Sequence, residues 1–275
     1  MTPEAAYDRF AEDYRDWWGP VIAPSAVTLL DRLDGMVPVD RPVRIVDVGA
    51  GTGTLSLAAL ERWPNARVIA VDPSARILDL ANAAAGERGL GDRLQTEVGD
   101  AARLPLADAS VDVAMTTFVL QLVPNRSAAV REAFRALRPG GTFACLTWRA
   151  NEGPFEAAMA FEDAADDLDI DLPDRPNGVG RAYPTAASAA TELRRAGFRS
   201  VRAHEQWLEH RFTPRSYLEV LEHWIEDDVF EALNEPMRQR LRAIALRRFE
   251  KLDSQSLVWR RPLVSVVGRR PEQAA

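Results

Sequence analysis

The sequence contains few residues of the types that build metal centres and disulfides. Among its 275 residues there is one cysteine, Cys145, and there are three histidines. A single cysteine excludes a disulfide framework and a thiolate metal site. Because Cys145 lies inside a predicted strand, we interpret it as a small buried apolar side chain. The sequence therefore predicts no metal site and no cysteine chemistry.

Lysine is almost absent, because Lys251 is the only one among 34 basic residues, and the formal net charge is −7. The basic stretch at 238–251 is interpreted as a solvated helix face, since an acidic chain does not favour nucleic acid. The acidic residues of 162–174 are interpreted in the same way. No run of eighteen apolar residues occurs, and no basic segment with an apolar stretch opens the chain. We expect a cytoplasmic protein without a membrane span that does not bind nucleic acid.

The length and the 47% of hydrophobic residues allow one large core rather than two. We predict a single domain over residues 1–275. Its parts are N-terminal cap helices at 1–40, a cofactor-binding core at 41–149, an insertion at 150–183, and the C-terminal half of the sheet at 184–275, which carries a helical insertion at 213–255.

The most informative motif is an apolar strand at 43–48 that ends in three alternate glycines and leads into a helix. Glycine lets the backbone turn sharply against a ligand, and the helix start presents unpaired N–H groups there. The spacing is G-x-G-x-G, whereas a dinucleotide site requires G-x-G-x-x-G. Asp47 precedes the first glycine by two residues, where a carboxylate would crowd a pyrophosphate but could accept hydrogen bonds from a cationic amino-acid tail, directly or through water. The motif indicates a nucleoside cofactor.

Two further acidic residues follow predicted strands. Asp72 ends the strand at 67–71 and stands 21 residues after Gly51, which is the distance at which an acidic side chain binds a ribose hydroxyl pair. Asp100 follows the strand at 94–98. Because ligands of open α/β sheets bind at the carboxyl ends of the strands, we expect these carboxylates to share one site with the glycines.

Further strands are predicted at 111–117, 142–148, 200–208 and 257–267, with a Leu-x-Pro-Gly-Gly turn at 137–141 before the second of these. Strands that alternate with helical segments are typical of an α/β fold.

The glycine-rich segment resembles motif I of the class I S-adenosylmethionine-dependent methyltransferases. The segment at 6–14 is similar to the opening of the ubiquinone- and menaquinone-type enzymes, where a helix folds over the cofactor. The resemblance implies a doubly wound, Rossmann-like seven-stranded sheet, mostly parallel with an antiparallel last strand, with helical cap insertions. It implies S-adenosyl-L-methionine as the cofactor and an aspartate at position 100 that reaches the adenine amino group. The implied cofactor-binding residues are Asp47, Gly49, Ala50, Gly51, Thr52, Gly53, Asp72, Pro73, Asp100, Ala101 and Thr117.

The predicted chemistry needs few protein groups. A sulfonium methyl is already a strong electrophile, so catalysis consists mainly of holding the acceptor and excluding water. A base is needed only if the acceptor arrives protonated. His204 falls in mid-strand and is interpreted as a packing or surface residue, while His210 and His223 are candidates to face the pocket, with a surface position as the alternative. We assign no catalytic residue.

Apolar rings concentrate in the segments that are expected to close over the cofactor, which favours a small, largely apolar acceptor for O-, N- or C-methylation. The chain lacks the Asn/Asp-Pro-Pro-aromatic element that the family's exocyclic-amine enzymes carry after the strand at 111–117. Packing of the rings on the sheet is the alternative. The candidate pocket residues are Tyr7, Tyr14, Trp18, Gln121, His210, His223 and Trp224.

Two other functions stay open. A protein that binds S-adenosylmethionine without transferring its methyl group carries the same cofactor motifs. A nicotinamide-dependent oxidoreductase needs the dinucleotide spacing and a group such as Tyr-x-x-x-Lys, which a chain whose one lysine lies at 251 does not favour. The sequence determines neither the acceptor nor the oligomeric state.

Overall fold

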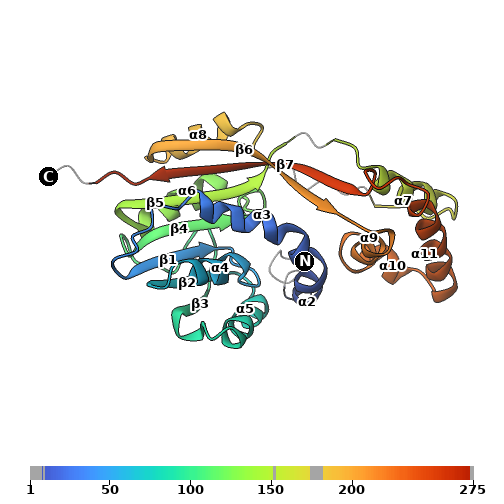
Figure 1. Cartoon of the computed structure of the whole chain (residues 1–275), viewed down its shortest axis with the longest axis horizontal. Coiled ribbons are helices and arrows are strands. Elements are labelled where there is room, and N and C mark those ends of the chain that lie inside the picture. The colour runs from blue at the N-terminus through green and yellow to red at the C-terminus, as the bar shows by residue number, and fades with distance from the viewer. Residues whose placement is uncertain (1–7, 9, 151–152, 174–181, 273–275) are drawn as a thin grey trace.

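The computed structural model describes residues 8, 10–150, 153–173 and 182–272. They build a seven-stranded sheet of order β3-β2-β1-β4-β5-β7-β6 (Figure 1). Strands β1 to β5 pair in parallel, whereas β7 is antiparallel to both of its neighbours. The predicted doubly wound sheet with an antiparallel last strand is thereby confirmed. The strands are β1 Val43–Val48, β2 Ala66–Asp72, β3 Leu94–Val98, β4 Val111–Thr117, β5 Leu137–Trp148, β6 Arg199–Arg211 and β7 Val258–Arg269.

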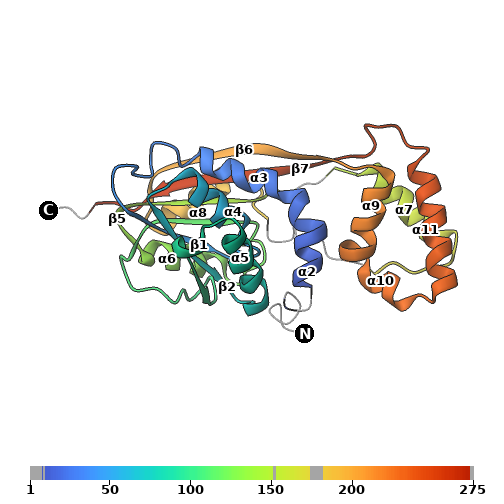
Figure 2. The ribbon, with the colours of Figure 1, turned by 60° about the horizontal axis from the view of Figure 1, so that its bottom comes forward.

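Strands β5 and β6 are several residues longer than the sequence predicted. β5 begins at Leu137, because the Pro-Gly-Gly segment is a bulge within the strand, with a register shift against β4 and a φ of +79° at Gly140. β6 and β7 continue to the pair Arg211↔Val258, past the end of β5. The two strands therefore leave the sheet as an antiparallel ribbon (Figure 2).

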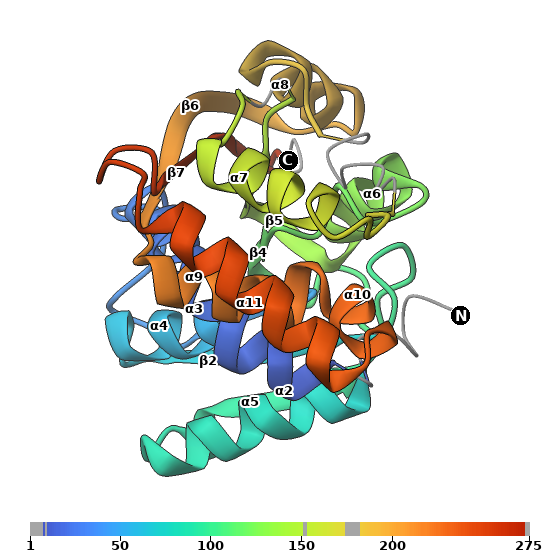
Figure 3. The same cartoon turned by 90° about the vertical axis from the view of Figure 1, so that its right-hand side faces the viewer.

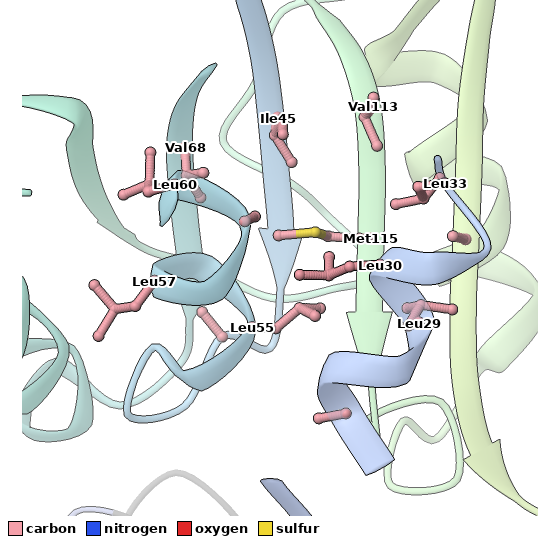
Figure 4. Packing of buried hydrophobic residues seen from close by; sticks show 14 of the residues in the cluster. Leu29, Leu30, Leu33, Ile45, Leu55, Leu57, Leu60, Val68, Val113 and Met115 are labelled. Atoms are coloured by element: carbon pink, nitrogen blue, oxygen red, sulfur yellow. The ribbon is translucent and has the colours of Figure 1, made fainter. Parts of the chain in front are cut away.

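One face of the sheet is covered by helices α3 (Gly19–Asp31), α4 (Thr54–Arg62) and α5 (Ala75–Glu87). Each presents a stripe of aliphatic side chains, and Figure 4 shows those of α3 and α4 meeting over Ile45 and Met115. Both of these residues are fully buried. Helices α3 and α4 thus pack on one face of strand β1, which leads to the glycines.

The opposite face carries α6 (Arg126–Ala136) and α8 (Ala186–Arg195). Cys145 lies in this layer without any exposed surface, and burial raises the pKa of its thiol to about 12. The prediction that it is a buried small side chain is confirmed. A thiol in this state supplies no nucleophile.

The two insertions pack against one another as a second, smaller core. Helices α7 (Glu156–Asp166), α9 (Pro214–Val220), α10 (Asp227–Ala232) and α11 (Glu235–Phe249) surround a cluster of aromatic side chains. We call these helices, with the π-helical turn η4 (Leu221–Ile225), the helical cap. The ribbon of β6 and β7 carries this cap beyond the carboxyl ends of the parallel strands, and Figure 3 shows α11 crossing in front of the sheet.

Several basic side chains of α11 pair with carboxylates of the cap. Arg242 bonds Glu222, and Arg248 bonds Asp167 at 2.6 Å. Such pairing supports the interpretation of 238–251 as a helix face rather than a nucleic-acid surface. Within the described parts of the chain, no helix is long and apolar enough to cross a membrane, and no cluster of acidic, histidine or cysteine side chains has the arrangement of a metal site.

Candidate cofactor and acceptor site

A cavity of about 390 Å³ opens at the carboxyl ends of β1, β2, β4 and β5. The N-terminal segment and η4 of the helical cap form its other walls. The described residues that line it are Tyr14, Trp18, Ile22, Gly49, Gly51, Asp72, Pro73, Ile77, Gly99, Asp100, Ala101, Thr117, Phe118, Val119, Gln121, Leu122, Val123, Pro124, Trp148 and Trp224.

The three glycines after β1 all adopt left-handed backbone conformations, with φ of +70° at Gly49, +55° at Gly51 and +82° at Gly53. Only glycine enters this region without steric cost. Gly49 has a second requirement, because a Cβ there would stand 2.2 Å from Cγ2 of Val119. The motif therefore fixes the shape of the cavity floor.

The N–H groups of this loop are bonded inside the protein. Those of Gly49 and Ala50 donate to the carbonyl of Val71 at 2.7 and 3.0 Å. That of Gly51 donates to Asp72. These residues precede α4, which begins at Thr54, and their N–H groups are engaged because the turn folds back on β2. A loop whose donors are engaged suits a cofactor that brings no phosphate.

Asp72 joins two sides of the cavity. Its Oδ2 accepts the N–H of Gly51 and its Oδ1 accepts that of Ser74, both at 3.0 Å. The side chain is largely buried, and desolvation raises the pKa of its carboxyl while these two N–H groups oppose the rise. Each oxygen keeps a further lone pair for a ligand hydroxyl.

Asp47 does not line the cavity. Its side chain is 1% exposed and accepts a hydrogen bond from the Ser56 hydroxyl at 2.7 Å. Desolvation raises the pKa of Asp47 to about 7, and the charge of Asp72 adds to the rise. β1 directs this side chain into the protein, where it ties the loop to α4, and its contact with an amino-acid tail, directly or through water, stays a prediction.

Asp100 lies at the cavity rim with an exposed side chain, whose Oδ1 accepts the N–H of Ala102 at 2.8 Å. Gly99 precedes it, and a Cβ there would stand 2.7 Å from Cδ of Pro105. Glycine at this position therefore lets Pro105 pack beside the loop, and Asp100 lines the cavity where a ligand's polar edge can reach it.

The predicted cofactor residues thus divide into two groups. The cavity lining includes Gly49, Gly51, Asp72, Pro73, Asp100, Ala101 and Thr117, whereas Asp47, Ala50, Thr52 and Gly53 lie outside it and build the loop. Their contacts with a cofactor stay predictions.

Aromatic rings form the side of the cavity away from the glycines. Tyr14 and Trp18 lie on the π-helical turn η1 (Tyr14–Trp18), and Trp224 lies on η4. Tyr14 and Trp224 meet edge to face with ring centroids 5.5 Å apart. π-helical turns are rare and often occur at functional sites. The structure therefore brings three predicted pocket residues together from opposite ends of the chain.

The other pocket candidates are placed differently. His210 packs against Phe212, with desolvation lowering the pKa of its imidazole, and His223 stacks on Trp17 with centroids 4.6 Å apart. Neither histidine lines the cavity, and His204 is exposed. Tyr7 lies outside the described residues. Gln121 lines the cavity although it is 5% exposed.

Sequence reasoning missed Phe118 and Trp148 among the lining residues. Trp148 ends β5, so the rule that ligands bind at strand ends would have found it. Phe118 carried no comparable signal, because its place depends on a backbone conformation that its residue type disfavours.

The donor set fits the cofactor implied by the sequence motif. The cavity offers two carboxylates for hydroxyl and amino groups, a glycine loop at its floor, and apolar rings. No lysine, arginine or histidine occurs among the lining residues that the structure describes. A pyrophosphate would find no cation there.

Comparison with known proteins agrees with this geometry. Residues 46–145 match the methyltransferase domain family. The fold is that of the class I S-adenosylmethionine-dependent methyltransferases, and the chain is similar to the ubiquinone- and menaquinone-type enzymes. It is 34% identical to a ubiquinone/menaquinone biosynthesis C-methyltransferase of Rubrivivax gelatinosus over 58% of this chain and 64% of that protein.

A 27-O-demethylrifamycin SV methyltransferase of Amycolatopsis mediterranei is 31% identical over 50% of this chain and 55% of its own length. In both relatives the match spans less than two thirds of the relative. A putative sarcosine dimethylglycine methyltransferase from Galdieria sulphuraria shares the fold, with a TM-score of 0.57, 14% identity, and coverage of 90% of this chain and 86% of that one.

Proposed function

We propose that this protein transfers a methyl group from S-adenosyl-L-methionine to a small, largely apolar acceptor. The observation that carries the proposal is the meeting of the glycine loop, two strand-end carboxylates and several aromatic rings in one cavity. The family match and the relatives support methyl transfer, and the acceptor is inferred from the cavity.

Different residues of the cavity would bind different parts of the cofactor. Asp72 would hold the ribose hydroxyls with the lone pairs left after its two backbone bonds. Asp100 would accept from the adenine amino group at the rim. The missing side chain at Gly49 makes room for Val119, which lines the cavity. Tyr14 covers Gly51, since a Cβ there would stand 3.7 Å from the Tyr14 ring.

S-adenosyl-L-methionine, when bound, supplies a methyl group on a positively charged sulfur, which is an electrophile with a neutral leaving group. The chain then has to orient the acceptor and exclude water. The rings of Tyr14, Trp18 and Trp224 do both from η1 and η4. We assign no general base, because both Asp72 oxygens accept backbone N–H groups and no histidine lines the described cavity.

Calorimetry with S-adenosylhomocysteine and NAD tests the cofactor assignment. We expect binding of S-adenosylhomocysteine, and tighter binding of NAD would contradict the proposal. Methyl transfer is then followed from labelled S-adenosylmethionine to small aromatic acceptors, RNA, DNA and protein. Transfer to a macromolecule rather than to a small acceptor would overturn the acceptor class. Cofactor binding without transfer to any acceptor would favour the binding protein considered above.

A further inference from the structure

Phe118 stands in a backbone conformation that its residue type rarely adopts. It follows β4 directly and has a φ of +56°. Left-handed conformations of non-glycine residues are costly and persist only where the surroundings impose them, often at ligand sites. Its N–H donates to the carbonyl of Leu146 on β5 at 2.8 Å. The residue is therefore held in place and lines the cavity.

The side chain of Gln121 is bonded to the backbone of this turn. Its Nε2 donates to the carbonyl of Phe118 at 2.6 Å, and its Oε1 accepts the Thr147 hydroxyl at 2.6 Å. Both side chains are buried. Thr147 directly precedes Trp148 on β5, so one amide ties the turn of Phe118 to the strand that carries Trp148.

The tie brings two rings together. The centroids of Phe118 and Trp148 are 4.6 Å apart with planes at 39°. Trp148 contacts Trp259, which in turn meets Trp18, both pairs edge to face. These contacts fix the ring of Trp148 from behind. The rings of Phe118 and Trp148 together form an aromatic wall on one side of the cavity.

The charges around this wall are of one sign. The carboxylates of Asp72 and Asp100 are the only charged side chains among the described residues that line the cavity. An acceptor with a carboxylate or phosphate would lose its hydration beside two acidic side chains and gain no basic side chain in return. An uncharged ring loses nothing of this kind and gains stacking on the wall.

We propose that the wall of Phe118 and Trp148 is the acceptor subsite, that it takes planar, uncharged aromatic acceptors, and that Gln121 is the positioning residue that holds it. This inference rests on the proposed function and specifies its acceptor. Gln121 acts through Phe118, since its amide is engaged at both ends.

Three probes of similar size separate shape from charge. Their binding is measured by calorimetry near neutral pH, with and without S-adenosylhomocysteine. The first probe, 1-naphthol, is flat and neutral. Decahydro-1-naphthol is neutral but not flat, and 1-naphthoate is flat but anionic. We expect 1-naphthol to bind roughly tenfold or more tightly than either of the others, a ratio that corresponds to about one good aromatic stack. Equal or tighter binding of either comparison probe would overturn the inference.

Variants test the role of Gln121. Phe118→Gly removes the ring at a position where glycine has no backbone strain, so it should retain the fold and S-adenosylhomocysteine affinity while losing about tenfold in 1-naphthol affinity. Gln121→Met replaces the amide by a side chain of similar length that makes neither hydrogen bond. It should lower the affinity for 1-naphthol about tenfold as well. Gln95→Met, at an exposed glutamine of β3, is the matched control and should change nothing.

The double variant decides whether Gln121 acts through Phe118. We expect Gln121→Met to add no further loss of 1-naphthol affinity once Phe118→Gly is present. Additive losses, or an unchanged affinity in Phe118→Gly, would overturn the inference, and Phe118→Gly keeps the test valid if Gln121→Met does not fold. If the wild-type protein binds S-adenosylhomocysteine and transfers methyl groups but does not prefer 1-naphthol, only this inference is contradicted. If it does not bind S-adenosylhomocysteine, the proposed function is contradicted.

Discussion

The carboxylate of Asp72 accepts a hydrogen bond from the backbone N–H of Gly51, 21 residues earlier in the chain, at 3.0 Å. Its other oxygen accepts the N–H of Ser74 at the start of α5. The residue proposed to bind the ribose therefore also holds the glycine loop to the end of β2. Loop shape and ribose binding are coupled through one side chain.

Asp72→Ala should lower the affinity for S-adenosylhomocysteine by more than about tenfold, because charge-assisted hydrogen bonds contribute roughly 1.5–3 kcal/mol each. The loop also loses its acceptor for the Gly51 N–H. Calorimetry measures the effect. Asp79→Ala, at an exposed aspartate of α5, is the control and should bind normally. An unchanged affinity in Asp72→Ala would remove this residue from the site.

Gly49→Ala should abolish S-adenosylhomocysteine binding or the fold, since the new Cβ meets Val119 at 2.2 Å. Gly35→Ala is a matched control, because Gly35 has a φ of +71° with no atom within 4 Å of a built Cβ. Both variants carry the same backbone strain, so the difference between them reports the clash.

The clash can also be relieved. Adding Val119→Ala to Gly49→Ala should restore part of the thermal stability, because the two side chains compete for one space. Equal melting temperatures of Gly49→Ala and Gly35→Ala would show that Val119 moves aside freely, which is contrary to our expectation.

Asp47→Asn should become more stable than the wild type as the pH rises. The pKa of Asp47 is about 7 in the folded protein, above its ordinary value of 3.8, so folding favours the protonated carboxyl. The contribution of the Asp47 carboxyl to the free energy of unfolding is complete below about pH 4 and is lost as the pH rises through about 7. The difference in unfolding free energy at high pH should reach at most roughly 4 kcal/mol.

Denaturant unfolding of Asp47→Asn and of the wild type between pH 4 and pH 8 checks this expectation. Asp79→Asn, at an exposed position, should follow the wild type throughout. Parallel stability curves for Asp47→Asn and the wild type would mean that Asp47 does not change its protonation over this range.

Trp224→Ala should raise the KM for the acceptor several-fold and change S-adenosylhomocysteine affinity much less. The ring is half-buried at the cavity mouth and contacts Tyr14 across the junction of η4 and η1. Trp207→Ala, at a ring that is 56% exposed on β6, is the control. If Trp224 is instead a core ring, the melting temperature will fall, because large-to-small core substitutions cost about 3–5 kcal/mol.

The sequence by itself determined the sheet and the cofactor loops. Strand β1, the three glycines and Asp72 are close in the sequence or separated by a fixed helix and strand, so their spacing specifies their geometry. Glycine adopts left-handed φ values at low cost, so the three glycines by themselves predict the conformation of this loop. The same local reasoning placed Asp100 at the end of β3.

Only the tertiary structure decided the acceptor side. Tyr14 and Trp224 meet across 210 positions of the chain because the ribbon of β6 and β7 carries the helical cap back over the strand ends. The turn of Phe118 depends on a buried amide and a hydroxyl from β5, and the burial of Asp47 depends on Ser56 of α4. These contacts arise from packing between segments that are distant in the sequence, so the spacing of residues along the chain does not predict them.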